Sequence, residues 1–200
     1  MTAIPKQTAS LSEVVSTCLQ SIVSVVPAGE AILTASAGSY AHWWNTVFSQ
    51  EHDPSQLRGE SNHFRYRPYQ HVLLRAEGMG ELQIAQVVLG TITCGVKLDV
   101  SVARQTDLTR ALNCSVIEES EAQLIERLAM SSTKYGSLRV EALSVDLQVA
   151  TNKAGLQVIA RPPLANGRLE LLAYLREQSV SETTHRYGNI IPKASEIPDC

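Results

Sequence analysis

The sequence has no long apolar run, no block of like charge and no clustered cysteines, and each of these absences excludes a class of protein. No apolar run approaches the ~20 residues that a membrane-spanning helix needs, and the first ten residues lack the charged-then-apolar pattern of a signal peptide. The 17 basic and 20 acidic residues leave a formal charge of -3, which argues against a nucleic-acid surface or a basic membrane helix. We therefore expect a cytoplasmic protein.

No motif for a metal site or a catalytic nucleophile is present. There is neither a CxxC pair nor Cys/His ligand spacing around the four cysteines, Cys18, Cys94, Cys114 and Cys200. No Gly-x-Ser-x-Gly sequence provides the nucleophile of a serine hydrolase. His52 and Asp53 are residue types that serve as acid and base in catalysis, but side chains at neighbouring positions in a chain seldom point at one site. We predict no metal site and no catalytic residue.

Residues 1–69 are predicted to form helices and a connecting loop. Ser10 and Glu13 have the spacing of a capping box, and apolar residues then recur at helical spacing until Pro27. A second helix is expected over residues 39–49. Its two tryptophans are interpreted as a packing anchor, since no basic groove accompanies them.

Residues 70–160 alternate between strand and helix patterns, which is typical of a parallel sheet with crossover helices. Five strands are predicted, over residues 71–76, 96–101, 114–118, 138–142 and 156–160. The helices between them have local start signals, namely Gly80, Thr106 and the capping box of Ser120 with Gln123. We therefore predict an α/β, Rossmann-like core of about five mainly parallel strands, within one globular domain.

The stretch 144–155 is ambiguous. Val145, Leu147 and Val149 alternate as a strand does, and residues 152–155 suit a hairpin turn. However, Ser144 is a good N-cap, Gly155 is a good helix stop, and a parallel sheet needs a crossover here. We predict a helix.

Residues 161–193 are predicted to form a C-terminal arm, followed by a tail over residues 194–200. Two prolines and the Asn166-Gly167 pair indicate a sharp turn, and residues 168–176 suit a short amphipathic helix or an irregular apolar segment. Residues 178–187 are polar and β-tolerant. A strand of that kind buries little of itself, so it needs another sheet or another chain to complete it.

Two runs, LANGRLELLAYLREQSVSETTHRYGN and HWWNTVFSQEHDPSQLRGESNHFRYRP, resemble the C-terminal region of long-form proline utilization A, over about residues 39–193. In that family, an FAD-dependent proline dehydrogenase and an NAD-dependent glutamate semialdehyde dehydrogenase share one polypeptide. The resemblance implies an aldehyde-dehydrogenase-like domain without catalysis or a bound cofactor of its own. It also implies a β-flap that covers the dehydrogenase module and helps to seal the cavity through which the intermediate passes.

The arm is predicted to pair with a partner sheet, with main-chain hydrogen bonds for affinity and alternate side chains for specificity. The expected partner is the proline dehydrogenase and glutamate semialdehyde dehydrogenase module, in cis or in trans. Homo-oligomerisation through the arm and a merely solvated edge strand remain open. The predicted interaction residues are Arg176, Glu177, Gln178, Ser179, His185, Arg186, Tyr187, Gly188 and Asn189.

An alternative is an NAD(P)- or nucleotide-binding oxidoreductase domain that uses Gly78, Gly80 and Asp99. The two glycines follow a predicted strand and open a helix, and Asp99 is expected at the end of the next strand, where a ribose-binding acid lies. Against it, Gln83 replaces the third glycine, and Glu77 places negative charge where a pyrophosphate binds. The resemblance agrees, because this chain lacks the Trp-Asn-Pro loop and the ribose-contacting lysine of true aldehyde dehydrogenases.

Overall fold

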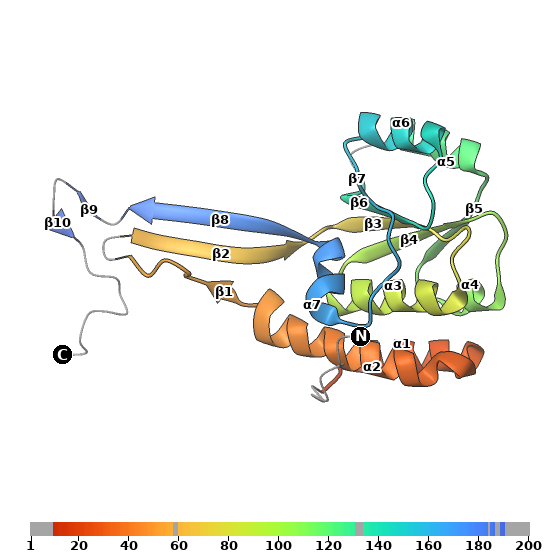
Figure 1. Ribbon diagram of the computed structural model, residues 1–200, viewed down its shortest axis with the longest axis horizontal. Coiled ribbons are helices and arrows are strands. Elements are labelled where there is room, and N and C mark those ends of the chain that lie inside the picture. The colour runs from red at the N-terminus through yellow and green to blue at the C-terminus, as the bar shows by residue number, and fades with distance from the viewer. Residues whose placement is uncertain (1–9, 58–59, 131–133, 184, 187–188, 191–200) are drawn as a thin grey trace.

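A five-stranded parallel sheet forms the centre of the molecule (Figure 1). The computed structural model describes residues 10–57, 60–130, 134–183, 185–186 and 189–190. The sheet order is β5-β4-β3-β6-β7, which is the strand order of a Rossmann fold and confirms the predicted class. Its strands are β3 (His71–Arg75), β4 (Lys97–Val102), β5 (Ser115–Glu118), β6 (Ser137–Val140) and β7 (Gln157–Ile159).

Helices cover both faces of this sheet, which explains why side chains on both faces of its central strands are buried. Val72 and Leu74 face one cluster of buried side chains, whereas Leu73 and Leu138 face the other. One layer holds α1 (Glu13–Val25), α2 (Glu30–Trp43), α3 (Glu81–Thr93) and α4 (Asp107–Ala111). The other holds α5 (Glu121–Met130) and α6 (Val145–Lys153), as Figure 1 shows.

The crossover helices begin where the sequence predicts. The Thr106 hydroxyl accepts from the backbone N–H of Thr109 at 3.2 Å, and the Ser120 hydroxyl accepts from that of Gln123 at 3.3 Å. Ser144 likewise caps α6, and Gly155 has a φ of +66 just after the helix. The helical prediction for residues 144–155 is therefore confirmed.

The N-terminal helices differ from the prediction in their boundaries. Ser12, not Ser10, caps α1, because its hydroxyl accepts from the backbone N–H of Val15 at 3.4 Å. The second helix begins at Glu30, well before residue 39, and continues as a π-helical turn over Trp44–Phe48. Helix α2 packs against α1, α3 and α7 (Gly167–Glu170), and small residues are buried on more than one of its sides. Its sequence therefore lacks the single apolar stripe by which a helix is predicted.

A second sheet, antiparallel and in the order β1-β2-β8, projects from the body (Figure 1). It contains β1 (Glu51–His52), β2 (Glu60–Pro68) and β8 (Leu175–Thr183), and we refer to it as the arm. Helix α7 (Gly167–Glu170) and a 3₁₀ turn over Leu171–Tyr174 lead into β8. The predicted arm strand was expected to need another sheet or another chain, and part of that need is met within the chain, because β2 pairs with β8 over its whole length.

Candidate functional site

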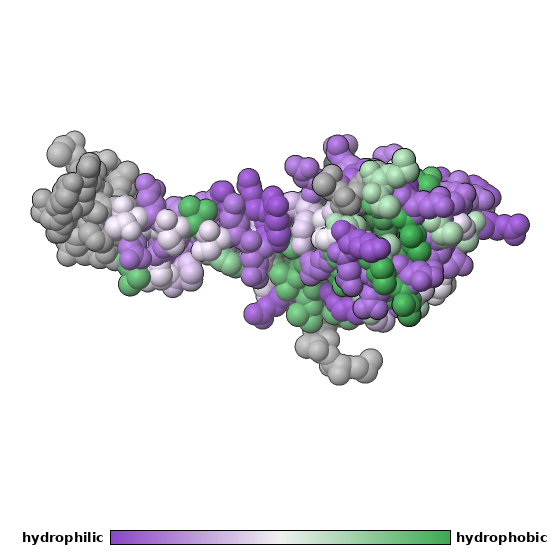
Figure 2. All heavy atoms as spheres, turned by 90° about the horizontal axis from the view of Figure 1, so that it is seen from above, coloured by the Kyte–Doolittle hydropathy of each residue, from purple (hydrophilic) through white to green (hydrophobic). Residues whose placement is uncertain are grey.

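The arm is built on a long ladder between β2 and β8. The two strands pair over nine residues, from Glu60↔Thr183 to Pro68↔Leu175. Every residue of β8 after Leu175 is exposed, and Figure 2 shows mainly polar surface along this part of the arm. Among the described strands, β8 pairs only with β2. Its other edge is therefore open along the described part of the arm.

The hydrogen-bonding pattern of β8 identifies the main-chain groups on that open edge. The backbone N–H of Tyr69 donates to the Tyr174 carbonyl at 3.0 Å, directly beyond the Pro68↔Leu175 pair. Bonded and non-bonded pairs alternate in an antiparallel ladder, and Pro68, which has no N–H, falls on a non-bonded pair as expected. The backbone N–H and C=O groups that point away from β2 therefore belong to Glu177, Ser179, Ser181 and Thr183.

Side-chain contacts between the three strands give the arm a defined shape before any partner binds. Arg65 of β2 donates to the Glu51 carboxylate of β1 at 2.6 Å and to the Gln178 amide oxygen of β8 at 2.8 Å. The hydrogen bond from Arg65 is the main cause that lowers the pKa of Glu51. On the other face, the ring of Tyr66 packs edge-on against Phe48 and Phe64, with centroids 4.8 and 5.2 Å away.

A buried carboxylate, Glu170, holds the base of the arm on the body. It forms an ion pair with Arg139 of β6 at 3.0 Å, and both residues are 0% exposed. It also accepts hydrogen bonds from the Tyr174 hydroxyl at 2.6 Å and from the Leu164 backbone N–H at 2.9 Å. No local pattern indicates this role, since Glu170 lies in a segment interpreted only as amphipathic or irregular.

The structure does not bring the residues of the alternative nucleotide site together. Gly78 has a φ of +80 and Gly80 is the N-cap of α3, so both lie beyond the carboxyl end of β3. Asp99 instead lies inside β4, opposite Leu73, and not at the end of the strand where the prediction placed it. The reason is that β4 continues for three further residues, to Val102.

The groups that would bind a nucleotide are already bonded within the chain. The Gln83 amide oxygen accepts from the Gly80 backbone N–H at 2.8 Å, and the Glu77 carboxylate accepts from that of Ala103 at 3.3 Å. An anion at the start of α3 would have to displace the first of these contacts and lie near the second. The geometry therefore gives the nucleotide alternative no support.

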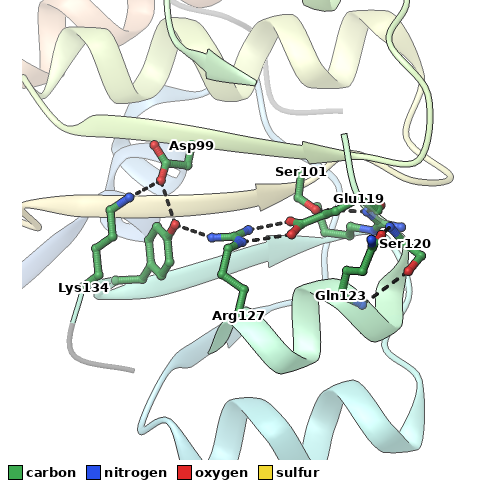
Figure 3. Close-up of polar contacts among 9 residues, drawn as sticks. Asp99, Ser101, Glu119, Ser120, Gln123, Arg127 and Lys134 are labelled. Carbon is green, nitrogen blue, oxygen red and sulfur yellow. Dashed lines mark hydrogen bonds and ion pairs between the residues drawn. The ribbon is translucent and has the colours of Figure 1, made fainter. Parts of the chain in front are cut away.

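Asp99 belongs to a chain of polar contacts that ties α5 to the sheet (Figure 3). Its carboxylate accepts from Lys134 Nζ at 2.5 Å and from the Tyr135 hydroxyl at 2.7 Å. Burial alone raises the pKa of Asp99, but these hydrogen bonds outweigh burial and the pKa is lowered. Arg127 of α5 continues the chain by donating to Tyr135 at 2.5 Å and to both carboxylate oxygens of Glu119. The role of Asp99 is thus structural.

The described thiols do not have the environment of a catalytic nucleophile. Cys18, Cys94 and Cys114 are free, and burial raises the pKa of each, to about 11 for Cys114. Such thiols stay protonated at neutral pH. His52 Nε2 donates to the Val47 carbonyl, 2.9 Å away, and the Asp53 carboxylate accepts from the Ser55 backbone N–H at 3.2 Å, so each side chain makes a local structural contact.

The described part of the chain contains no group of three or more His, Cys, Asp and Glu side chains that could hold a metal ion. No helix within these same residues is long and apolar enough to cross a membrane.

The predicted interaction residues divide into three groups. Residues 176–179 lie on the exposed length of β8. The backbones of His185, Arg186 and Asn189 form a short antiparallel pair, β9 (His185–Arg186) with β10 (Asn189–Ile190). Tyr187 and Gly188 lie outside the described residues.

Comparison with solved structures shows a likeness to a known protein. No family model and no curated protein matches the chain. Among solved structures, proline utilization A (PutA) from Corynebacterium freiburgense is similar, with a TM-score of 0.60 and 26% sequence identity over 95% of this chain. The chain spans only 16% of the length of that protein. The likeness supports a domain related to proline utilization A and a Rossmann-like fold.

Proposed function

We propose that this chain is a non-catalytic structural domain of a proline-catabolic enzyme. Its arm docks on the glutamate semialdehyde dehydrogenase module, in cis or in trans, and helps to retain the intermediate between the two active sites. The observation that carries the proposal is the preformed arm with its open β8 edge. The likeness to proline utilization A supplies the enzyme context.

Docking occurs by addition of a partner strand to β8. The outward N–H and C=O groups of alternate β8 residues supply main-chain hydrogen bonds, and the exposed side chains select the partner. Because contacts within the arm already order β8, little conformational entropy is lost on binding. No observation on the described residues favours the rival function, an NAD(P)-binding oxidoreductase domain.

A proline at Ser179 tests strand addition directly. Ser179 directs its N–H away from β2, so the Ser179→Pro variant removes one donor from the open edge and leaves the bonds to β2 in place. Ser179→Ala is the matched control, because it changes the side chain and keeps the N–H. Calorimetric titration with the dehydrogenase module from the same source should show at least tenfold weaker binding for the proline variant and wild-type binding for the alanine variant.

Coupled kinetics provide a second readout. When proline is the substrate, a retained intermediate gives NADH without a lag, whereas a leaking assembly gives a lag. The proline variant should lengthen the lag and the alanine variant should not. Equal affinity and equal lag for both variants would show that the open edge is not the docking site. Deletion of residues 178–200 is a less specific test, because it also removes the partner of β2.

A further inference from the structure

Two exposed arginines lie directly opposite one another on the arm. Arg67 of β2 and Arg176 of β8 are cross-strand partners, so their side chains share one face of the ladder. Neither side chain makes a hydrogen bond or an ion pair within the described part of the chain. Like charges at directly opposed positions destabilise a sheet. The free chain therefore carries an unfavourable pair at the base of its arm.

The acidic side chain nearest to this pair among the described residues, Glu51 of β1, is already bonded to another arginine. Within the β2–β8 ladder the diagonal neighbours on the same face are Gln178 and Arg65, and Glu51 of β1, opposite Arg65, is a further diagonal neighbour of Arg67. The nearby Glu51 carboxylate is already bonded to Arg65 at 2.6 Å and lies 3.5 Å from His63. Glu177 projects from the opposite face, since side chains alternate along a strand. Within the described residues, the positive charge of Arg67 and Arg176 thus has only a partial counterpart, the Glu51 carboxylate that Arg65 already binds.

We propose that this arginine pair receives a carboxylate side chain from the docked strand of the dehydrogenase module. The inference rests on the proposed function and specifies which residue type the partner strand presents to β8. A strand that pairs with the open edge of β8 places one residue about 4.5–5.5 Å from Arg176 on the same face. Arginine binds carboxylates through two parallel N–H bonds, and Arg67 adds positive charge from the adjacent strand.

The same register defines a second feature of the partner strand. Val180, which is 43% exposed, lies on the face of Arg176 and four residues further along β8. A docked strand therefore carries an Asp or Glu opposite Arg176 and an aliphatic residue four positions away, opposite Val180. This combination of a charged and an aliphatic residue distinguishes the proposed partner strand from an arbitrary strand that could pair with β8.

Charge reversal at Arg176 separates docking from stability. Arg176→Glu removes the unfavourable pair and creates an ion pair with Arg67, so the free chain should melt about 1–3 °C higher than the wild type. The same change should weaken binding to the module at least tenfold, and raised salt should weaken wild-type binding more than that of the variant. Arg104→Glu is the matched control, because Arg104 is exposed beyond the carboxyl end of β4, at the other end of the sheet from the arm. It should change neither quantity.

The outcomes distinguish this inference from the proposed function. If Ser179→Pro weakens binding but Arg176→Glu does not, strand addition stands and the arginine pair has another role. If the wild-type chain does not bind the module, both proposals fail. Sedimentation of the chain alone that shows dimers lost in the Arg176→Glu variant would identify a second copy as the occupant and overturn the assignment to the dehydrogenase. Rescue of the variant by an Arg in place of the partner's carboxylate would establish the contact.

Discussion

Replacement of Glu170 by glutamine tests whether the base of the arm depends on a buried charge. The side chain keeps its size but loses the negative charge that faces Arg139, and both positions are 0% exposed. The amide would also present donor hydrogens to groups that now donate to the carboxylate, including the Tyr174 hydroxyl and Arg161 Nη1. A buried guanidinium would thus be left without its counter-charge.

The expected loss is large on the scale of a domain's stability. Removal of one partner of a buried ion pair costs about 3–5 kcal/mol, against a total unfolding free energy of roughly 5–15 kcal/mol. For a chain of this size, each 1 kcal/mol corresponds to about 2–4 °C in Tm. Glu170→Gln should therefore lower the Tm by roughly 6–20 °C.

Urea unfolding followed by circular dichroism measures this loss. Glu177→Gln is the control, since Glu177 is exposed on β8 and its neutralisation should change stability by no more than about 0.5 kcal/mol. The double change Arg139→Met with Glu170→Gln removes the unpaired guanidinium and keeps an acceptor oxygen for Tyr174 and Leu164, so it should recover part of the loss. A decrease below about 1 kcal/mol for Glu170→Gln would refute the argument.

Two further predictions concern close packing and pH. Gly167→Ala should destabilise the chain by about 1–3 kcal/mol in urea unfolding, because the new Cβ would lie 2.6 Å from the backbone oxygen of Ser39. Gly38→Ala is its control, since that Cβ meets nothing within 4 Å, and it should not destabilise. The lowered pKa of Asp99 adds stability that is complete above the ordinary value of 3.8 and is lost as the pH falls through the folded-state value. Unfolding at pH 7 and pH 3 should thus show a smaller acid loss for Asp99→Asn than for the wild type; an equal loss would contradict the role given to Lys134.

The parallel core was predictable because its signals are local. Thr106 and Ser144 cap their helices through bonds to residues three positions away, and Gly155 ends its helix by its own positive φ. Each of these features is determined by a few neighbouring residues. Alternation of strands and helices then leaves few topologies for the sheet.

The arm was only partly predictable because its partner lies far away in the sequence. Residues 60–68 contain polar residues and end in Pro68, and they become a strand by pairing with β8, more than a hundred residues later. The role of Glu170 is equally non-local, since Arg139 and Leu164 reach it from different segments. Asp99 was misplaced for a simpler reason, namely that it was taken to end its strand, whereas β4 continues for three residues beyond it.

Contacts of Tyr69 connect the arm rigidly to the central sheet. Tyr69 separates β2 from the central strand β3, and its backbone N–H bonds to the Tyr174 carbonyl at the start of β8. Its hydroxyl donates to the Gln157 amide oxygen of β7 at 2.8 Å, and its ring lies so close to Gly136 that a Cβ there would be 2.1 Å from it. A force on the arm is therefore transmitted to the central strand and to the neighbouring β6 and β7. A docked module would be held in a fixed orientation relative to the sheet, which a covering role requires and which a flexible tether would not provide.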